Sequence, residues 1–379
     1  MASKKRKVLV ITGTRAEFGY LRPVLAEISK SKKLSLRLLV TGMHTLRRFG
    51  NTRREVAKEF PVAETVAVGE RDSMLQALGK EIAGIERYCR RERPDLMLVI
   101  ADRDEGFAGA IVAGHLGIPL AHLSGGSTSG RGVDEAIRHS ISKFAHAHFA
   151  WTAQNGKRLR AMGEEPWRVH VSGSTAFDTL RQAPLMSRRA LAKELGLGSL
   201  PWIIVVQHPV PLDTTPLRGQ LAPTLRAAAR FDAERIIVYP NSDTGHEGFV
   251  RAIKKLKGAR RTHVYKNIPH RAFLSLMRHA QVLVGNSSSG IEEAGYFKLP
   301  VVDIGGRQNG REHGANVLHA PYDAGKIARA IRAALSPQFA RKARKAKHPY
   351  YRGNASKKIA GMLERLPLDN KLRYKKIPM

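Results

Sequence analysis

The stretch AQVLVGNSSSGIEEAG, residues 280–295, decides the fold class of this sequence. Its apolar half has the length and composition of a buried strand, which we expect to end at Gly285. Its polar half turns at NSSSG and continues into a helix that we expect to begin near Ile291. A strand that turns directly into a helix is the repeating unit of doubly wound α/β sheets.

The same unit recurs along the chain, because apolar runs of strand length alternate with segments whose apolar residues have helical spacing. The runs are KVLVITG (7–13), LSLRLLVTG (34–42), DLMLVIAD (95–102), GFAGAIVAGHLG (106–117), IPLAHLSG (118–125), HAHFAWT (146–152), RVHVSGS (168–174), WIIVVQHP (202–209), RIIVYPNSD (235–243), THVYKNIP (262–269), AQVLVGNSS (280–288) and LPVVDIGG (299–306). Continuous runs of β-branched residues and leucine indicate buried parallel strands, so we predict an α/β protein.

Two domains are expected, because the alternation weakens over residues 175–200 and then restarts. We predict a first doubly wound domain at residues 1–182 and a second, nucleotide-binding domain at 183–354. The basic tail, residues 355–379, is expected to pack on the first domain. Ligands of such sheets bind beyond the carboxyl ends of the strands, so the predicted site is the cleft between the domains.

Composition limits the choice of compartment and partner. Among 379 residues there is one cysteine, Cys89, which excludes an internal disulfide framework and fits a reducing compartment. No apolar run reaches the length of a membrane span, so we expect a cytoplasmic protein. The net charge of +33 attracts phosphates, yet aromatic residues make up only 6% and the basic residues are scattered. A nucleic-acid partner is therefore the less favoured interpretation.

The opening stretch has the features of a phosphate-binding turn. Unpaired N–H groups at a helix N-terminus bind anions, and Ser287, Ser288 and Ser289 add hydroxyl groups while Gly290 gives a ligand room to approach. Glu293 follows in the first turn, where a carboxylate either stabilises the helix dipole or accepts hydrogen bonds from a ribose. Both interpretations of this carboxylate stay open at this point.

Two further turns place cations at strand ends. Arg307 and Arg311 lie in GGRQNGR after a strand, where forked guanidinium groups suit phosphate oxygens. Arg15 follows the first strand in TGTRAEF, which is not the glycine fingerprint of dinucleotide binding, so we do not predict NAD.

Several motifs, taken together and in order, resemble the UDP-N-acetylglucosamine 2-epimerases, and most closely their hydrolysing branch in sialic and legionaminic acid pathways. These motifs are TGTRAEFGYLRPV (12–24), IADRDEGFAGA (100–110), HLSGGSTSGRGVDEAIRHSISKFAHAHF (122–149), VSGSTAFD (171–178), VVQHPV (205–210), YPNSD (239–243) and VGNSSSGIEEAGYFKLPVVDIGGRQNGR (284–311).

This resemblance implies two Rossmann-like domains of GT-B-like architecture, with a nucleotide sugar between them and no cofactor or metal. It also implies a homo-oligomer, either a dimer or a tetramer. The catalytic residues that it implies are Asp102, Asp134, Glu135 and His208. The residues that it implies for substrate or UDP binding are Arg15, Arg138, His139, Asn286, Ser287, Ser288, Ser289, Gly290, Glu293, Arg307 and Arg311.

The implied reaction removes the proton at C2 of the sugar, expels UDP from C1 and adds water to the resulting glycal. It requires a positioned carboxylate base and a stabilised diphosphate leaving group. The family's loop usually reads HxEGGE or HxHGGE, whereas this chain carries Ser124 and Ser127 there. Since serine needs an activator to act as a base, the carboxylates named above are the expected acid and base groups.

We therefore expect a hydrolysing 2-epimerase acting on a UDP-linked 2-acetamido sugar. Two alternatives stay open. One is a glycosyltransferase of the same architecture, and the other is a nucleotide-sugar-binding protein that has lost epimerase activity.

Overall fold

The computed structural model describes residues 5–128, 133–211, 213–240 and 245–376, which form two compact units. The first unit combines residues 1–181 with 350–379, and the second is continuous from 182 to 349. Parts of two motifs, residues 129–132 and 241–243, lie outside the described residues.

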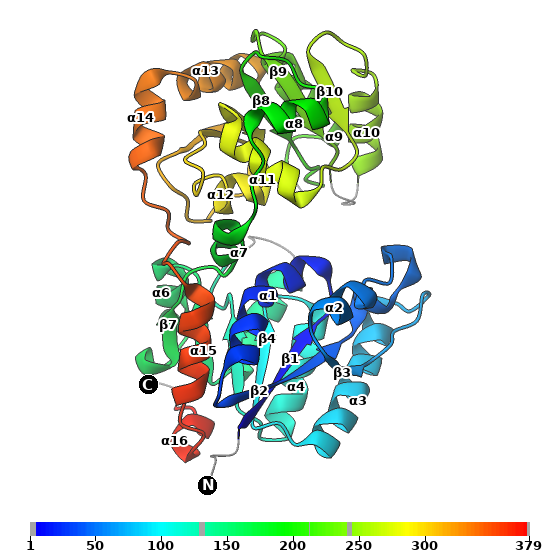
Figure 1. Ribbon diagram of the computed structural model, residues 1–379, viewed down its shortest axis with the longest axis vertical. Helices are drawn as coiled ribbons and strands as arrows, with labels where there is room; N and C mark the ends of the chain where they lie inside the picture. The colour runs from blue at the N-terminus through cyan, green and yellow to red at the C-terminus, as the bar shows by residue number, and fades with distance from the viewer. Residues whose placement is uncertain (1–4, 129–132, 212, 241–244, 377–379) are drawn as a thin grey trace. The chain divides into compact units, whose positions relative to one another are not determined.

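A parallel sheet forms the centre of the first unit (Figure 1). Within the described residues its strands follow the order β3-β2-β1-β4-β5-β6-β7. They are β1 (Arg6–Thr12), β2 (Leu34–Val40), β3 (Val62–Thr65), β4 (Leu96–Ile100), β5 (Leu120–Leu123), β6 (Ala147–Ala150) and β7 (Val169–Val171). Every residue of β4, β5 and β6 is buried; β4 is therefore an unbroken apolar run, whereas β5 and β6 each include one buried histidine, His122 and His148.

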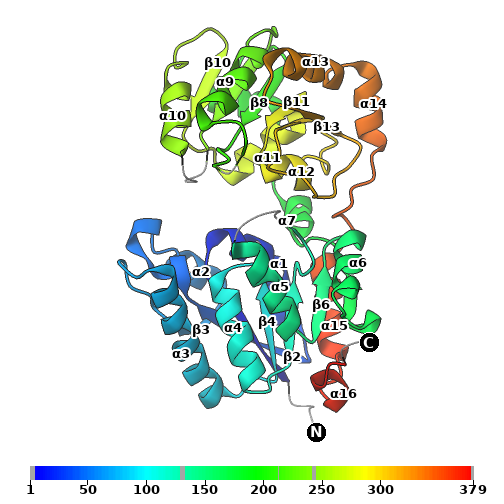
Figure 2. The same cartoon turned by 180° about the vertical axis from the view of Figure 1, so that it is seen from behind.

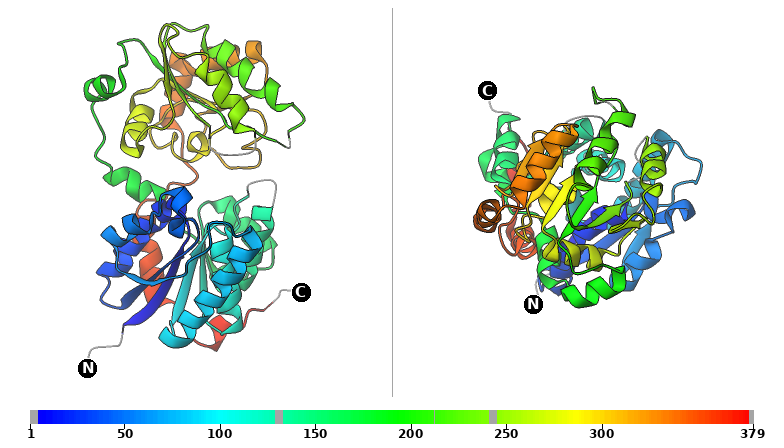
Figure 3. Two further views of the ribbon diagram at one scale, coloured as in Figure 1. Left: turned by 90° about the vertical axis from the view of Figure 1, so that its right-hand side faces the viewer. Right: turned by 90° about the horizontal axis from the view of Figure 1, so that it is seen from above.

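Helices cover both faces of this sheet. Helices α1 and α15 lie side by side on one face in Figure 1, and α3, α4 and α5 lie side by side on the opposite face in Figure 2. The helices of the unit are α1 (Arg15–Lys30), α2 (Arg53–Glu59), α3 (Met74–Glu92), α4 (Asp104–His115), α5 (Val133–Phe144), α6 (Ala153–Ala161), α7 (Ala176–Gln182, whose last residue falls in the second unit), α15 (Ala355–Arg365) and α16 (Asn370–Arg373). Figure 3 shows the sheet between its two helical layers.

The second unit repeats the plan with a parallel sheet in the order β10-β9-β8-β11-β12-β13. Its strands are β8 (Trp202–Val206), β9 (Glu234–Val238), β10 (Thr262–Tyr265), β11 (Val282–Gly285), β12 (Val301–Ile304) and β13 (Val317–Ala320). Its helices are α8 (Arg188–Leu195), α9 (Leu217–Ala228), α10 (His246–Lys254), α11 (His270–His279), α12 (Ser288–Glu292), α13 (Ala324–Ala334) and α14 (Pro337–Lys345). The fold class predicted from the sequence, two Rossmann-like α/β units, is confirmed.

The strand predicted at residues 106–117 is wrong, because residues 104–115 form helix α4. The helix is apolar almost all round, so its sequence resembles a buried strand. Small residues let it lie directly against the sheet: a side chain at Gly109 would come within 2.5 Å of Ile11 and 3.1 Å of Val99. The glycine and alanine content of this run, rather than its hydropathy, is the signal that distinguishes the helix.

Helix α12 also begins earlier than predicted, at Ser288 instead of near Ile291. Ser287 is its N-cap residue and accepts a hydrogen bond from the backbone N–H of Ser289. Serine is a favoured capping residue, which explains the earlier start. Among the helices described here, none is both long and apolar enough to cross a lipid bilayer.

Candidate active site

In each sheet the strand order reverses at one place, between β1 and β4 in the first unit and between β8 and β11 in the second. Helices leave such a reversal point on opposite faces of the sheet, which opens a crevice at the carboxyl ends of the two strands. Directly after these four strands come Arg15, at the first position of α1, and the loop residues Asp102, His208 and Asn286. The predicted site residues therefore fall into two groups, one at the carboxyl ends of the strands in each sheet.

In the first unit, Asp102 is held by an ion pair with Arg138. Asp102 follows β4, and Arg138 reaches it from α5. The Arg138 side chain is 4% exposed, whereas Asp102 is 21% exposed. A buried guanidinium group beneath a partly exposed carboxylate fixes the direction in which that carboxylate points.

A buried histidine fixes the backbone just before Asp102. The Nε2 atom of His122, on β5, lies 2.8 Å from the carbonyl oxygen of Ala101, and its Nδ1 atom lies 3.1 Å from the hydroxyl of Ser142. Burial lowers the pKa of His122 to about 3, so the ring is neutral at physiological pH. Ala101 itself has a left-handed backbone, with φ of 63°, which this contact helps to hold.

Both serines of the loop after β5 are buried, with Ser124 1% exposed and Ser127 7% exposed. Ser124 also adopts a left-handed backbone, with φ of 67°. In the described part of this loop, residues 124–128, there is no carboxylate. Acid–base chemistry at this edge of the sheet must therefore come from other residues.

Helix α5 supplies two further carboxylates, and their surroundings differ. Partial burial raises the pKa of Asp134, and the negative charge of Asp102 raises it further. Glu135, in contrast, lies 3.2 Å from His139 one helical turn later. A carboxylate oriented by an arginine suits a base, and a neighbouring carboxyl group with a raised pKa is the better placed of the two to act as an acid.

The first unit also contains buried carboxylates that the sequence prediction missed. Glu17 accepts a hydrogen bond from the backbone N–H of Gly13 and is 6% exposed. Glu105 is 4% exposed and contacts Arg103 at 3.3 Å. Burial, with Glu105 nearby, raises the pKa of Glu17 well above its usual value. The signal in the sequence was a glutamate three residues after the capping Thr14, which is also the pattern of an ordinary helix cap.

Arg15 occupies the first position of α1 and is exposed. Its guanidinium group therefore lies near the positive end of the helix dipole, where a bound anion is favoured. The structure thus agrees with a position at the carboxyl edge of the sheet, and contact with a nucleotide stays a prediction.

In the second unit, Asn286 joins the loops after β8 and β11. Its side-chain oxygen accepts from the backbone N–H of His208 at 2.7 Å, and its amide donates to the His208 carbonyl oxygen at 2.9 Å. Asn286 is fully buried. The preceding Gly285 has φ of 135°, and a side chain there would approach the Val206 carbonyl oxygen to 1.9 Å. Only glycine allows the two strand ends to come this close.

The carbonyl oxygen of Asn286 also anchors the loop after β12, residues 305–311, which we call the arginine loop. It accepts from Gln308 at 2.8 Å and from Arg307 at 3.3 Å. Arg311, from the same loop, forms a 3.0 Å ion pair with the buried Glu292 of α12. Asn286, Arg307 and the start of α12 are therefore gathered at one edge of the second sheet.

The serines and Gly290 divide into different roles. The hydroxyl groups of Ser287 and Ser289 lie 2.9 Å apart at the start of α12, and Ser288 is exposed. Gly290 instead faces the sheet, because a side chain there would meet Val301 at 3.0 Å. Gly290 therefore also packs against the sheet, and its contact with a ligand stays a prediction.

Glu293 is distinguished from Glu292 by its pKa. Burial of its carboxyl group, and then the charge of Glu292, raise the pKa of Glu293 to about 7. A carboxyl group that titrates near neutral pH is a candidate ligand contact.

The fold agrees closely with solved structures of nucleotide-sugar epimerases. A crystal structure described as UDP-GlcNAc 2-epimerase from Neisseria meningitidis bound to UDP-GlcNAc aligns with a TM-score of 0.81 and 19% identity. The alignment covers 95% of this chain and all of that one. The UDP-GlcNAc 2-epimerase from Methanocaldococcus jannaschii aligns with a TM-score of 0.76 and 20% identity, over 95% of this chain and 99% of that one.

The sequence relationship is more specific than the fold. A profile of the UDP-N-acetylglucosamine 2-epimerase family matches residues 26–364. UDP-N,N'-diacetylbacillosamine 2-epimerase (hydrolyzing) from Legionella pneumophila is 33% identical over 98% of both chains. UDP-N-acetylglucosamine 2-epimerase from Neisseria meningitidis serogroup B is 36% identical over 87% of this chain and 88% of that one. This chain therefore belongs to the UDP-N-acetylglucosamine 2-epimerase family.

Proposed function

We propose that this protein is a hydrolysing 2-epimerase that converts a UDP-linked 2-acetamido sugar into the free 2-epimer and UDP. The observation that carries the proposal is the 33% identity, over 98% of both chains, to the Legionella pneumophila relative named as a hydrolysing 2-epimerase. The Campylobacter jejuni relative, 30% identical over 83% of this chain and 84% of that one, is also named as hydrolysing.

The first unit would supply the proton transfers. Asp102 is the proposed base for the C2 proton, because Arg138 orients its partly exposed carboxylate. Asp134 is the proposed acid that returns a proton to C2, because partial burial and the nearby charge of Asp102 raise its pKa above the ordinary value. Glu135 and its partner His139 are proposed to bind the sugar or the incoming water.

The proposal assigns the base and acid roles to Asp102 and Asp134, because the loop with Ser124 and Ser127 has no carboxylate among its described residues. Asp102, after β4, and Asp134, in the first turn of α5, lie at the same carboxyl end of the sheet as the loop after β5 that holds Ser124 and Ser127. The serine hydroxyl groups are proposed to hydrogen-bond the sugar.

The second unit would hold UDP. Arg307 and the backbone at Ser288 and Ser289 are proposed to bind the diphosphate, and Glu293 to accept the ribose hydroxyl groups. His208 is proposed to protonate or hold the leaving phosphate.

Turnover in D₂O tests the proposal. The full chain is incubated separately with UDP-N-acetylglucosamine and with UDP-N,N'-diacetylbacillosamine, and the products are followed by NMR. We expect free UDP and a free 2-epimer carrying deuterium at C2 from at least one substrate. Asp102→Asn is the matched inactive control, with its fold checked by circular dichroism.

Other products would replace the proposal with a different one. A UDP-linked 2-epimer would make the protein a non-hydrolysing member of the family. UDP release without deuterium at C2 would indicate plain hydrolysis. Saturable UDP binding without turnover of either sugar would favour the nucleotide-sugar-binding alternative.

A further inference from the structure

Two histidines and an aspartate meet in the second unit, on residues that the proposed reaction does not use. Asp303 on β12 and His319 on β13 are direct partners in the parallel register, so their side chains project from the same face of the sheet. The Nδ1 atom of His319 lies 3.1 Å from a carboxylate oxygen of Asp303, which is 1% exposed. His313, from the loop that precedes β13, brings its Nε2 atom to 3.0 Å from the Nε2 atom of His319.

The outer hydrogen bonds of this cluster fix the tautomers of both rings. Asp303 accepts from Nδ1 of His319, and the carbonyl oxygen of Gly314 accepts from Nδ1 of His313 at 3.1 Å. Since a carboxylate and a carbonyl group only accept, both Nδ1 atoms carry hydrogen. In neutral rings both Nε2 atoms then present lone pairs. Two lone pairs facing each other at 3.0 Å repel, so the arrangement calls for a positive species between them.

The geometry points to a binding site for a divalent transition metal of the zinc class between His313 and His319. Zinc binds histidine nitrogen at about 2.0–2.1 Å, so tetrahedral coordination places two such nitrogens about 3.3 Å apart. The two Nε2 atoms need to separate only slightly from 3.0 Å to meet this value. The Asp303 carboxylate behind His319 completes the carboxylate–histidine–metal arrangement that orients and strengthens such ligands.

The site is expected to be open to solvent. His319 has a side chain that is 47% exposed, and His313 is exposed as well. Among the described residues no group of three or more histidine, cysteine, aspartate or glutamate side chains forms a ligand set. Water would therefore occupy the remaining positions, and the affinity would be lower than that of a structural zinc site.

Metal binding would tie the arginine loop to the edge strand. His313 belongs to the same segment between β12 and β13 as Arg307 and Gln308, which contact the Asn286 carbonyl oxygen. The metal would add a second fixed point to this loop. If the proposed function holds, this would order a diphosphate-binding loop, but the metal site itself does not depend on it.

Calorimetric titration of the chelator-treated full chain with zinc chloride tests the inference, and cobalt(II) absorption gives an independent readout. We expect saturable binding of one zinc ion per chain at this site. His313→Ala, on an exposed loop, should weaken it at least about tenfold, and Asp303→Asn about 10–100-fold as an outer partner of His319. His115→Ala, at the exposed end of α4, is the matched control and should leave binding unchanged.

The inference is overturned if zinc binds no more tightly than millimolar, or if His313→Ala binds it as tightly as the unaltered chain. The first result would mean that the positive species between the rings is a shared proton. Because these readouts involve no sugar or nucleotide, failure here would leave the proposed epimerase activity untouched.

Discussion

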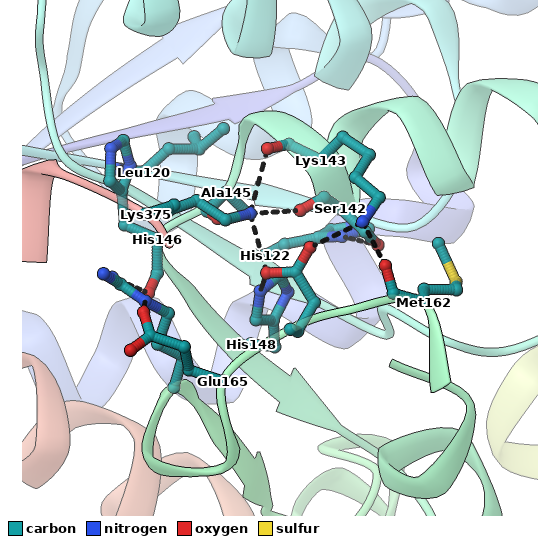
Figure 4. A network of polar contacts seen from close by, with 12 residues as sticks. Leu120, His122, Ser142, Lys143, Ala145, His146, His148, Met162, Glu165 and Lys375 are labelled. Atoms are coloured by element: carbon teal, nitrogen blue, oxygen red, sulfur yellow. Dashed lines mark hydrogen bonds and ion pairs between the residues drawn. The ribbon is translucent and has the colours of Figure 1, made fainter. Parts of the chain in front are cut away.

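Replacing Lys375 by methionine should destabilise the first unit by about 3 kcal/mol, because this lysine neutralises a buried carboxylate. Figure 4 shows the lysine reaching in from the C-terminal segment. Its Nζ atom lies 2.7 Å from Glu164 and donates to the carbonyl oxygens of Lys143 and Ala145 at 2.9 and 2.8 Å. Glu164 is fully buried in its side chain, as is His148, which contacts it at 2.9 Å.

Two considerations set the size of the stability loss: the pKa of Glu164 and the cost of breaking a buried ion pair. Although burial alone would raise it, hydrogen bonds from His148 and Lys375 bring the pKa of Glu164 down to about 2. Relative to the ordinary value of 4.5, that lowering corresponds to about 3 kcal/mol of stability from His148 and Lys375 together, present above pH 4.5 and lost as the pH falls toward 2, so it is an upper limit for the share of Lys375. Breaking a buried ion pair by removing one partner costs about 3–5 kcal/mol. We expect the lower end, because His148 at 2.9 Å and Lys143 at 3.4 Å keep their contacts with Glu164.

The pH dependence gives the prediction a second signature. Burial lowers the pKa of His148, and the charge of Lys375 lowers it further despite Glu164. Without Lys375 the folded chain should accept a proton on His148 at a higher pH. The stability lost in Lys375→Met should therefore shrink as the pH falls below the ordinary histidine pKa of 6.5.

Urea denaturation followed by tryptophan fluorescence measures this loss, because Trp151 and Trp167 belong to the first unit and the Lys371 ammonium lies over the Trp167 ring. Lys376→Met is the matched control, since Lys376 is exposed and adjacent. A loss below about 1 kcal/mol at pH 8, or one equal to the control at every pH, would refute the reasoning.

Three further predictions concern the candidate site. Gly285→Ala should lower the free energy of unfolding by at least about 2 kcal/mol in urea denaturation, because the new methyl group would overlap the Val206 carbonyl oxygen; an unchanged midpoint would contradict this. Asp102→Asn should reduce kcat about 10²–10⁴-fold with an unchanged circular dichroism spectrum, whereas activity within a few-fold would exclude it as the base. Calorimetry should show the affinity for UDP falling between pH 8 and 6, as Glu293, with its pKa of about 7, becomes protonated. Glu293→Ala should lower the free energy of UDP binding by about 1–3 kcal/mol at pH 8. A pH-independent affinity would remove Glu293 from the ribose role.

Continuous apolar runs were sufficient to predict the central strands of both sheets. Strands such as β4 and β8 are buried along their whole length, so burial on both faces leaves a strong pattern. The edge strands β3 (VAET) and β13 (VLHA) escaped prediction, whereas the equally short edge strand β10 (THVY) was predicted, because β10 is richer in β-branched and aromatic residues. Helix α4 was mistaken for a strand because a helix buried on nearly all sides carries no periodic contrast.

The candidate site was predicted by position, but its pairings were not. Asp102 and Arg138 were both expected there, yet 36 residues separate them, and only the fold brings them into an ion pair. The burial of Glu17 and Glu105 was likewise invisible, because a charged residue in a sequence is ordinarily read as exposed. The resemblance to a family supplied the roles, while the structure supplies the contacts on which those roles depend.

The return of the C-terminal segment to the first unit has a consequence for synthesis. Arg6 donates a hydrogen bond to the carbonyl oxygen of Leu363, and the Ser31 hydroxyl donates to Glu364 at 2.6 Å. During synthesis, the first unit therefore cannot complete its packing until the whole second unit has been translated, and until then the surface of α1 that contacts α15 stays uncovered. Since nascent domains generally fold as units, the continuous second unit is free to finish first, although its residues emerge later. A messenger RNA truncated shortly after codon 349 would yield one complete unit and one left open.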